Sequence, residues 1–596
     1  MALSLAHPDG TGWTEEYGYD AGRRLTGVQS TAGIFDYAYD PVKLQRVDGL
    51  TLPNGAYITN SYDSVARVLS TALVSSNGVS LDSQNYVYNA TGQRTSETNT
   101  PGDYRIYSYD SEGELTKALA HEPNGSTRLM DEAKYTYDAA GNMTSKEPGF
   151  NQFQTVNYTL NGLNEITNSL MGASVGFGWG VSNAVSGSTT SPATNVLVNG
   201  LAATLYADNS FYAIPFTISN GPNTYKATAW DTNGNVSSNS STVYAIPTNS
   251  FYGYDLNGNL TNDGYKSFAY DDENELIAVW VPNAWSNSFA YDGKMRRRIE
   301  RDYAYLPSSS SYLLTNEIHF ICDGNVVAEE RNASNVPLAS YTRGNDLSGT
   351  LQGAGGIGGL LARTTYSQEV PGAPTTAFYH ADGNGNVTAL IYPNQQLAAK
   401  YLYDPFGNIL AMSGPLMNFN KYRFSSKEWN DNSALYYYGY RFYDASLQRW
   451  PNTDLISEKG FENIRHITSI RSWTFMPPLM GLGGPNLYEF VRNSPVCGID
   501  LNGLDCRGDC FDQLVNCLNA RTTLMGAGGG VLAGGLGGGS IFCKGTLWGL
   551  AAGLSFPVVD CYSTYLGCLS GCQAIPPTPP LFPPGASAPG GYPWGI

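Results

Sequence analysis

The sequence predicts an all-β fold, because its composition and a recurring pattern both favour strands and turns. Tyr accounts for 42 and Gly for 67 of the 596 residues, and only 14% of the residues are charged. Tyr is enriched in strands and Gly in turns, so this composition favours strands over helices. From residue 17 the chain also repeats two aromatic residues, two positions apart, followed by Asp or Asn and then by Gly. A repeat of this kind is typical of a chain that folds as one large structural unit instead of several separate domains.

Each repeat has the signature of a β-hairpin. The first block is Tyr17–Asp20, and the Asp or Asn of successive blocks stands at positions 20, 40, 63, 89, 110, 138 and 161. Aromatic residues two apart on a strand project from the same face, and Asp with Gly supplies the turn after which the chain pairs back. One hairpin cannot bury its aromatic face alone, so the repetition predicts a continuous sheet that is closed, covered or wound. The period of the repeat fits a solenoid, a barrel or a propeller, and it does not distinguish among these three architectures.

The pattern is lost between residues 172 and 248. This stretch is rich in Ser, Thr, Asn and Val, and its alternating runs are separated by Asn and Gly turns. We expect a small Ig-like β-sandwich inserted into a surface loop, where insertions are well tolerated. An irregular long hairpin is the alternative interpretation.

Hairpin blocks resume after this stretch and continue to residue 420. Examples are Tyr252–Leu260, Phe289–Lys294 and Tyr401–Ile409. The run Arg296–Arg298 follows one of them, and on a strand its members alternate between the two faces. We therefore expect a solvated or salt-bridged strand there instead of a nucleic-acid site.

Aromatic residues are most concentrated between residues 421 and 504. The ordered blocks in this region are Tyr422–Glu428, Leu435–Asp444, Arg449–Asp454, Asn486–Phe490, Asn493–Pro495 and Asp500–Leu504. Together they resemble the RHS repeat-associated core (the RHS core domain), and the hairpin blocks upstream resemble the YD repeat of the same RHS/YD-repeat family. The resemblance implies a strip of antiparallel β-hairpins spiralled into a large hollow shell.

These observations divide the chain into five expected parts. They are a first stretch of YD-repeat shell (1–171), the Ig-like β-sandwich (172–248), a second stretch of shell (249–420), the RHS core (421–504) and a variable C-terminal segment rich in Cys, Gly and Pro (505–596).

The C-terminal segment has its own chemistry. It holds seven of the nine Cys residues, which favour either a disulfide-stapled extracellular segment or buried thiols packed among glycines. Residues 522–559 contain two apolar runs that either insert into a membrane as a hairpin or form a small packed or partly disordered module. The Pro- and Gly-rich residues 576–596 are expected to be unfolded.

Local motifs for cofactor or metal chemistry are missing from the sequence. It contains no H-E-x-x-H, P-loop or G-x-S-x-G block, and its five His residues are scattered singly. We therefore expect neither a cofactor nor a metal. The RHS resemblance implies an aspartyl autoprotease instead, in which Asp454 and Asp500 match the two catalytic carboxylates and the chain is cut after Leu504, at the bond to Asp505. Glu489 lies between the two blocks and is a further carboxylate candidate.

Two carboxylates held close together share one proton, because both cannot ionise cheaply. Such a pair activates a water and protonates the leaving amide, which gives single-turnover autoproteolysis. The sequence departs from the family pattern, however, since Leu455 and Leu501 replace the Pro expected after each Asp. The alternative is that Asp454 and Asp500 only cap turns.

The net charge of −17 bears on partners, because an acidic chain repels phosphate backbones and anionic lipid. We therefore expect no nucleic-acid partner, and membrane contact only through residues 522–559. Two functions fit: a polymorphic-toxin-like capsule that encloses and releases its own C-terminal segment, or a YD-repeat adhesion protein without cleavage. The first implies a secretion apparatus and the second implies carbohydrate binding to cell-surface glycans. Either protein would be secreted or at the cell surface, although no signal peptide is visible in the sequence.

Overall fold

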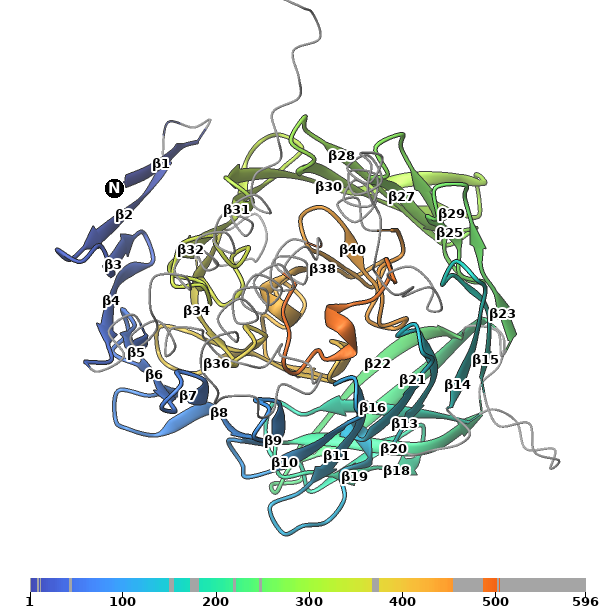
Figure 1. Ribbon diagram of the computed structural model, residues 1–596, viewed down its shortest axis with the longest axis horizontal. Helices are drawn as coiled ribbons and strands as arrows, with labels where there is room; N and C mark the ends of the chain where they lie inside the picture. Colours follow the sequence, from blue (N-terminus) through green and yellow to red (C-terminus); the bar gives the residue numbers. More distant parts are fainter. Residues whose placement is uncertain are drawn as a thin grey trace, which may run out of the picture. The chain divides into compact units, whose positions relative to one another are not determined.

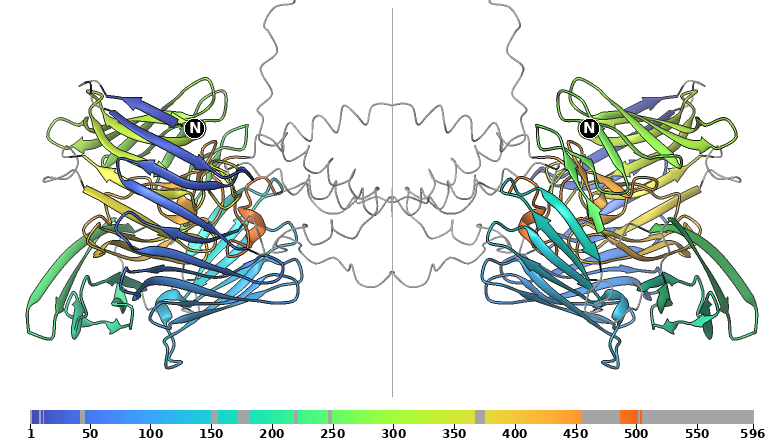
Figure 2. Two further views of the ribbon diagram at one scale, coloured as in Figure 1. Left: turned by 90° about the vertical axis from the view of Figure 1, so that its left-hand side faces the viewer. Right: turned by 90° about the vertical axis from the view of Figure 1, so that its right-hand side faces the viewer.

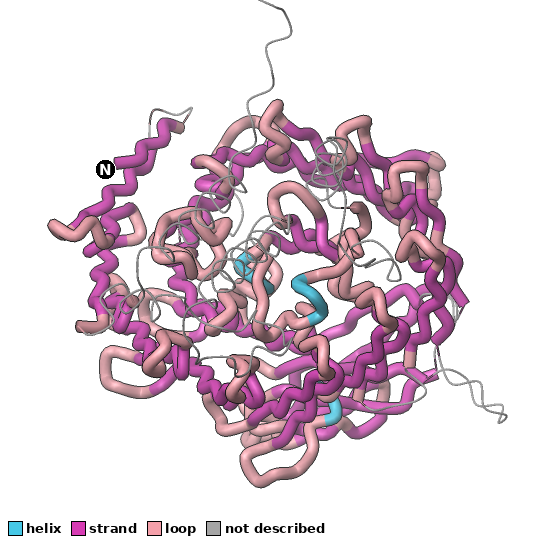
Figure 3. The backbone as a smooth tube through the Cα atoms, viewed as in Figure 1, coloured by secondary structure: helices cyan, strands magenta, loops and turns pink. Residues whose placement is uncertain are grey.

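The computed structural model describes residues 2–7, 10, 12–41, 46–149, 155–171, 182–217, 221–245, 249–366, 375–453, 486–500 and 503, which all belong to one compact unit. Figure 3 shows strands along most of this path. In these ranges the only helical elements are three short 3-10 turns, namely η1 (Leu129–Asp131), η2 (Phe424–Ser426) and η3 (Val491–Asn493). The predicted all-β fold is therefore confirmed.

The first long sheet has 16 strands, and each strand pairs antiparallel with its neighbour in chain order. Its members are β1 (Ala2–Ala6), β2 (Gly12–Tyr19), β3 (Leu25–Ser30), β4 (Gly33–Tyr39), β5 (Val47–Thr51), β6 (Tyr57–Tyr62), β7 (Val68–Val74), β8 (Ser80–Tyr88), β9 (Arg94–Asn99), β10 (Tyr104–Tyr109), β11 (Leu115–His121), β12 (Ala133–Tyr137), β13 (Met143–Pro148), β14 (Val156–Leu160), β15 (Ile166–Met171) and, beyond the insert, β23 (Asn249–Phe251).

The second long sheet has 14 strands in the same sequential order. Its members are β24 (Gly253–Tyr254), β25 (Leu260–Asn262), β26 (Ser267–Tyr270), β27 (Leu276–Val281), β28 (Trp285–Tyr291), β29 (Arg297–Leu306), β30 (Ser311–Asp323), β31 (Val326–Asn332), β32 (Pro337–Arg343), β33 (Leu360–Thr365), β34 (Thr375–Ala381), β35 (Val387–Ile391), β36 (Leu397–Tyr403) and β37 (Ile409–Ser413).

One turn geometry recurs along both long sheets and explains the Asp or Asn of the repeat. At Asp138, the Oδ1 atom accepts hydrogen bonds from the N–H groups of Ala140 and Asn142, each over 2.9 Å. The same pair of bonds forms at Asp63, Asn89, Asp110, Asn161, Asp255, Asp271, Asp292, Asn332, Asp382 and Asp404. The third residue after the Asp is left-handed, with φ 73° at Gly141, which is why Gly is favoured there.

The second aromatic residue of a repeat ties its hairpin to the preceding one. The hydroxyl of Tyr137 donates to the carbonyl of Leu115 over 2.8 Å. Equivalent bonds run from Tyr39, Tyr62, Tyr88, Tyr109, Tyr291 and Tyr403 to carbonyls of the hairpin before each. Within one repeat, the rings of Tyr401 and Tyr403 stack with centroids 6.2 Å apart, so both aromatic residues of this unit share a face as predicted.

The two long sheets are joined by side chains that are distant in the sequence. The carboxylate of Asp82 lies 2.9 Å from His380 Nδ1, and Glu329 Oε2 lies 2.7 Å from His7 Nε2. Further bonds join Tyr86 to Gly383 and Asn54 to Gln395, and these partners are 297 to 341 residues apart. Strands β1–β8 therefore run beside β31–β36, as Figures 1 and 2 show. We call this line of contact the seam.

Two small sheets lie between β15 and β23 in the sequence. One contains β16 (Ser182–Ser188), β19 (Thr204–Leu205) and β20 (Ser210–Thr217), and the other contains β17 (Asn195–Val198), β18 (Leu201–Ala202), β21 (Gly221–Trp230) and β22 (Val236–Ala245). Both sheets contribute to one apolar core, with Val196 and Val198 from one and Phe211 and Ala213 from the other. The insert is therefore a two-sheet sandwich.

The insert also binds back to the long sheets. The Arg128 guanidinium, fully buried after β11, donates to Asp208 over 2.9 Å. The hydroxyl of Ser186 donates to the carbonyl of Leu410 over 2.6 Å, and Ser188 donates to Met412 over 2.8 Å. Strand β16 thus satisfies carbonyl groups of β37, the last strand of the second long sheet, whose edge would otherwise be exposed.

The aromatic blocks near residue 440 form a separate small sheet with a dense aromatic cluster. Its strands are β38 (Glu428–Asn430), β39 (Leu435–Tyr437) and β40 (Phe442–Tyr443). The ring of Phe490 stacks on Tyr443 at 4.0 Å and meets Trp450 at 5.6 Å. We call residues 421–453 and 486–500 the core segment, drawn in orange within the curve of the long sheets in Figure 1.

Candidate functional site: the core segment and the turns that hold it

The hairpin turns of both long sheets hold the core segment. Each contact is a hydrogen bond between one turn and one core residue, and several turns contribute. From the first sheet the pairs are Asn493–Glu114 (2.9 Å), Asn486–Asn142 (2.9 Å) and Arg449–Asn164 (2.6 Å), and from the second they are Tyr488–Gly258 (2.8 Å), Asn452–Asn274 (3.3 Å), Pro495–Asn384 (2.8 Å) and Ala445–Asn408 (2.8 Å). The repeated turn is therefore also the repeated binding element for the core segment.

Two turn glycines permit this close approach. A Cβ atom on Gly258 would lie 2.7 Å from the Tyr488 hydroxyl, and one on Gly141 would lie 2.9 Å from Glu489 Oε1. Both distances are shorter than real Cβ contacts allow. Both positions favour Gly because their φ angles are positive, and Gly258 also lacks space, because Thr453 Cγ2 would lie 2.9 Å from its Cβ atom.

Asp500 is buried at the end of the core segment, with 5% of its surface exposed. Its Oδ1 atom accepts a hydrogen bond from the N–H of Gly503 over 2.8 Å, and its Oδ2 atom lies 3.9 Å from Arg441 Nη2. Arg441 in turn donates through Nε to the carbonyl of Gly503 and packs its guanidinium 4.2 Å from the centroid of the Trp450 ring. Asp500 and Gly503 are thereby joined to each other and to the buried Arg441 cation.

Lys427 is a second buried cation near this carboxylate. Its Nζ donates to the carbonyl of Gly355 over 3.0 Å and lies 5.3 Å from the centroid of the Tyr438 ring. Burial lowers the pKa of Lys427 to about 7, although the charge of Asp500 acts in the opposite direction. A lysine with this pKa exchanges protons near neutrality.

The predicted site residues fall in different places. Asp454, Leu504 and Asp505 lie outside the described residues, as do the cysteines and apolar runs of residues 505–596. Asp500 stands at the turn described above. Glu489 is placed beside Glu114, because the Asn493 amide donates to Oε1 of both carboxyls, over 3.1 Å and 2.9 Å.

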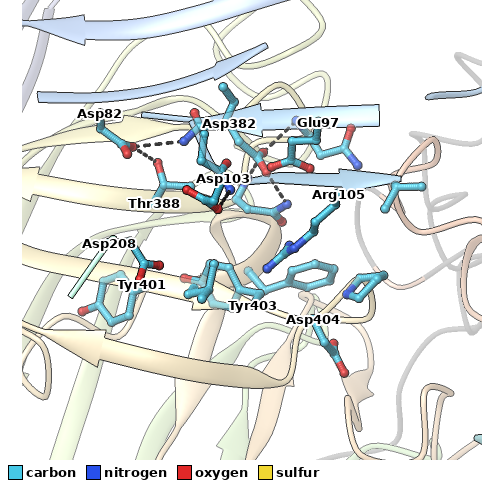
Figure 4. A pocket seen from close by; sticks show the side chains of 18 of the residues that line it. Asp82, Glu97, Asp103, Arg105, Asp208, Asp382, Thr388, Tyr401, Tyr403 and Asp404 are labelled. Atoms are coloured by element: carbon cyan, nitrogen blue, oxygen red, sulfur yellow. Dashed lines mark hydrogen bonds between the residues drawn. The ribbon is translucent and has the colours of Figure 1, made fainter. Parts of the chain in front are cut away.

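A polar cavity of about 70 Å³ lies where β8–β10 face β35 and β36 along the seam. Figure 4 shows Asp82, Asp103, Asp382 and Arg105 around it. Burial opposes ionisation of Asp82, but the hydrogen bond and charge of His380, with Lys400 and Thr388, outweigh this effect and hold the pKa of Asp82 below its usual range. No sequence pattern indicates this His–Asp pair, because its members are 298 residues apart.

Across the described part of the chain, no group of three or more His, Cys, Asp or Glu side chains is arranged to hold a metal ion. Nor does any of its helices have the length and apolar character needed to cross a membrane.

Comparisons with known proteins place these features in context. No protein-family model matches the chain. The tRNA3(Ser)-specific nuclease WapA of Bacillus spizizenii is 28% identical over 197 residues, which are 32% of this chain and 7% of WapA. The tRNA nuclease WapA of Bacillus subtilis is 26% identical over the same shares of both chains. The chain thus spans only a small part of these relatives.

Similar solved structures were also found. The crystal structure of TcdB2-TccC3 aligns with 84% of this chain and 24% of that chain, at 16% identity and a TM-score of 0.33. The Tc holotoxin pore of Photorhabdus luminescens aligns with 83% of this chain and 22% of that chain, at 16% identity and a TM-score of 0.32. The sequence similarity to WapA fits an RHS-like family.

Proposed function

We propose that the chain is an RHS-type β shell that encloses its own C-terminal segment, residues 505–596, and releases it by one cut after Leu504. This is delivery of the polymorphic-toxin kind, by a protein that is secreted or at the cell surface and meets a secretion apparatus. The observation that carries the proposal is the buried anchor of Asp500, Gly503 and Arg441, which holds the chain directly before the proposed cut.

The proposed chemistry is hydrolysis of one peptide bond. The ionised carboxylate of the Asp454–Asp500 pair removes a proton from water, whose oxygen attacks the Leu504 carbonyl carbon. The protonated carboxyl gives its proton to the Asp505 nitrogen as the C–N bond breaks, which leaves a carboxyl on Leu504 and an amine on Asp505. Arg441 supports the role of Asp500, because a nearby cation favours the ionised carboxylate.

The test is the intact mass of the purified protein after incubation. We expect a fragment of residues 505–596, and its loss in Asp500→Asn and Asp454→Asn, because Asn keeps the size of the side chain but cannot exchange the proton. The exposed Asp272→Asn is the matched control and should be cut like the wild type. Wild-type protein that stays uncut throughout would contradict the release step.

An uncut protein would favour the second function, adhesion at the cell surface through carbohydrate binding. One observation favours it: Asp500 Oδ1 caps the N–H of Gly503, which is the turn-capping role offered above as the alternative to catalysis. Glycan-array binding by uncut wild-type protein would support adhesion, and a blank array would count against it.

A further inference from the structure

Three side chains at the seam form a hydrogen-bonded line between the two long sheets. Nδ1 of His380, on β34, lies 2.9 Å from Oδ2 of Asp82 on β8, and Nε2 of the same ring lies 3.2 Å from Oγ1 of Thr71 on β7. All three residues are buried, with between 1% and 4% of their surface exposed. The order along the line is therefore carboxylate, imidazole and hydroxyl.

The two partners of the imidazole decide which of its nitrogens carries the proton. Burial opposes ionisation of Asp82, but the hydrogen bond and charge of His380 hold the pKa of this carboxyl below its usual range, so it is ionised at neutral pH. An ionised carboxylate only accepts hydrogen bonds, so Nδ1 of His380 is the nitrogen that donates to it. In the neutral imidazole Nε2 then has its lone pair, and the Thr71 hydroxyl donates to that nitrogen.

Two further hydrogen bonds hold the Asp82 carboxylate in this arrangement. Its Oδ2 atom also accepts from Thr388 Oγ1 over 2.5 Å and from Gln84 Nε2 over 3.3 Å, and Figure 4 shows Thr388 beside Asp82. Thr388 lies on β35 and Gln84 on β8, so both long sheets contribute. The carboxylate is therefore fixed before it orients the His380 ring.

The hydroxyl end of the line reaches a second and larger cavity. This cavity has a volume of about 380 Å³ and is lined by both Thr71 and His380, whereas Asp82 lines the smaller cavity of about 70 Å³. Its lining mixes apolar side chains, such as Leu50 and Ile58, with amide and guanidinium groups. The volume lies within the range of pockets that bind small molecules. A small molecule in this cavity can therefore contact the Thr71 hydroxyl.

We propose that Thr71, His380 and Asp82 form a second catalytic site, which hydrolyses carboxylic esters with a short acyl chain through an acyl-threonine intermediate. Thr71 is the nucleophile, His380 is the general base and Asp82 is the positioning residue. The two distances carry this assignment, because a nucleophile lies within about 2.6–3.2 Å of its base and a third group orients that base. The site is separate from the proposed cut after Leu504 and does not depend on it.

The proposed reaction has two steps. In the first, Thr71 Oγ1 attacks the carbonyl carbon of the ester while its proton passes to Nε2 of His380, and Nε2 then gives this proton to the departing oxygen, which leaves as an alcohol. In the second, a water attacks the acyl carbon, Nε2 takes a proton from that water and returns it to Thr71 Oγ1, and the carboxylic acid leaves. One ester and one water thus become one alcohol and one acid, and no other reactant is consumed.

Covalent labelling of the full chain with a short-chain alkyl fluorophosphonate tests the site. The phosphorus of this probe forms a bond to an activated hydroxyl oxygen and releases fluoride, so peptide mass spectrometry identifies the labelled residue. We expect the label on Thr71 of the wild-type protein. A label found only on other residues, or no label, would overturn the proposal, and this measurement requires no variant to fold.

Variants separate catalysis from a structural role of the same hydrogen bonds. Thr71→Val keeps the shape of the side chain without its hydroxyl and His380→Gln removes the base, so each should slow labelling and p-nitrophenyl butyrate hydrolysis by at least about 100-fold. Thr71→Ser should keep both reactions, because its hydroxyl remains. Thr342→Val is the matched control, since the hydroxyl of this buried residue also bonds across the seam, to Ser30 over 2.8 Å, and not to an imidazole. Equal losses in Thr342→Val and Thr71→Val would overturn the catalytic assignment.

Discussion

The side-chain amide of Asn493 donates a hydrogen bond to the carboxyl of Glu114 over 2.9 Å, which joins two residues 379 positions apart. The same amide donates to the carbonyl of Gly141 over 2.6 Å. One side chain of the core segment thus binds two neighbouring hairpin turns of the first long sheet. The core segment is held by the turns as much as by its aromatic packing.

Asn493→Ala should weaken this attachment. The substitution leaves the buried Glu114 carboxyl and the part-buried Gly141 carbonyl without this donor, which costs about 1–3 kcal/mol. We expect the free energy of unfolding from denaturant titration to fall by that amount. Asn233→Ala, at an exposed Asn, should leave it nearly unchanged. Equal effects of the two substitutions would show that the contact contributes nothing.

Gly258→Ala should destabilise the protein for two reasons. The residue has φ 79°, and a Cβ atom would lie 2.7 Å from the Tyr488 hydroxyl and 2.9 Å from Thr453 Cγ2. We expect a loss of about 1–3 kcal/mol in the free energy of unfolding, measured by thermal and chemical denaturation. Gly293→Ala is the control, because nothing lies within 4 Å of its Cβ position. A stable Gly258→Ala protein would show that the core segment can move away.

Tyr137→Phe should remove one of the tyrosine hydrogen bonds that join a hairpin to the preceding hairpin. The hydroxyl of this largely buried residue donates to the Leu115 carbonyl, so its loss should cost about 1 kcal/mol. Tyr19→Phe, at a ring that is 44% exposed, should change stability little. Calorimetric melting of both variants makes the comparison. Identical melting curves for the Tyr137→Phe and Tyr19→Phe variants would contradict a stabilising role for the tyrosine hydroxyls that bond to carbonyls.

Asp82→Asn should weaken the seam at neutral pH and remove part of its acid sensitivity. Because the pKa of Asp82 is held below its usual range, its ionised form stabilises the fold above the unfolded value near 3.8, and this stabilisation is lost as the pH falls through the lower folded value. We expect a lower melting temperature at pH 7 and a shallower decline below pH 4. A variant that declines like the wild type would place the acid sensitivity elsewhere.

Deleting residues 172–248 with a short Gly/Ser join should leave the long sheets folded but less stable. Arg128 would lose its bond to Asp208 while keeping Glu122 and Asp131. The carbonyls of Leu410 and Met412 would lose the serine hydroxyls of β16. Circular dichroism should keep its strand signal while the melting temperature falls. Complete loss of that signal would show that the insert is required for folding.

The repeated hairpin could be predicted from the sequence because the hydrogen bonds that form its turn join residues close together in the chain. Asp138 forms its turn with residues two and four positions away, so spacing alone predicts the hairpin. Glu489 and Glu114 meet only because the chain winds back, and no pattern in either neighbourhood indicates the other. His7 and His380 were interpreted as scattered single residues, yet each lies against a carboxylate about 300 positions away, at Glu329 and Asp82.

The sequential order of the strands has a consequence for how the chain is made. Each new strand pairs with the one before it, so the growing sheet can extend hairpin by hairpin as synthesis proceeds. The seam cannot form in this way, because Asp82 is synthesised about 300 residues before its partner His380. Strand β16 likewise precedes β37, whose carbonyls it covers, by 224 residues. The first sheet must therefore stay soluble, with one face uncovered, for the time that the ribosome takes to add these residues.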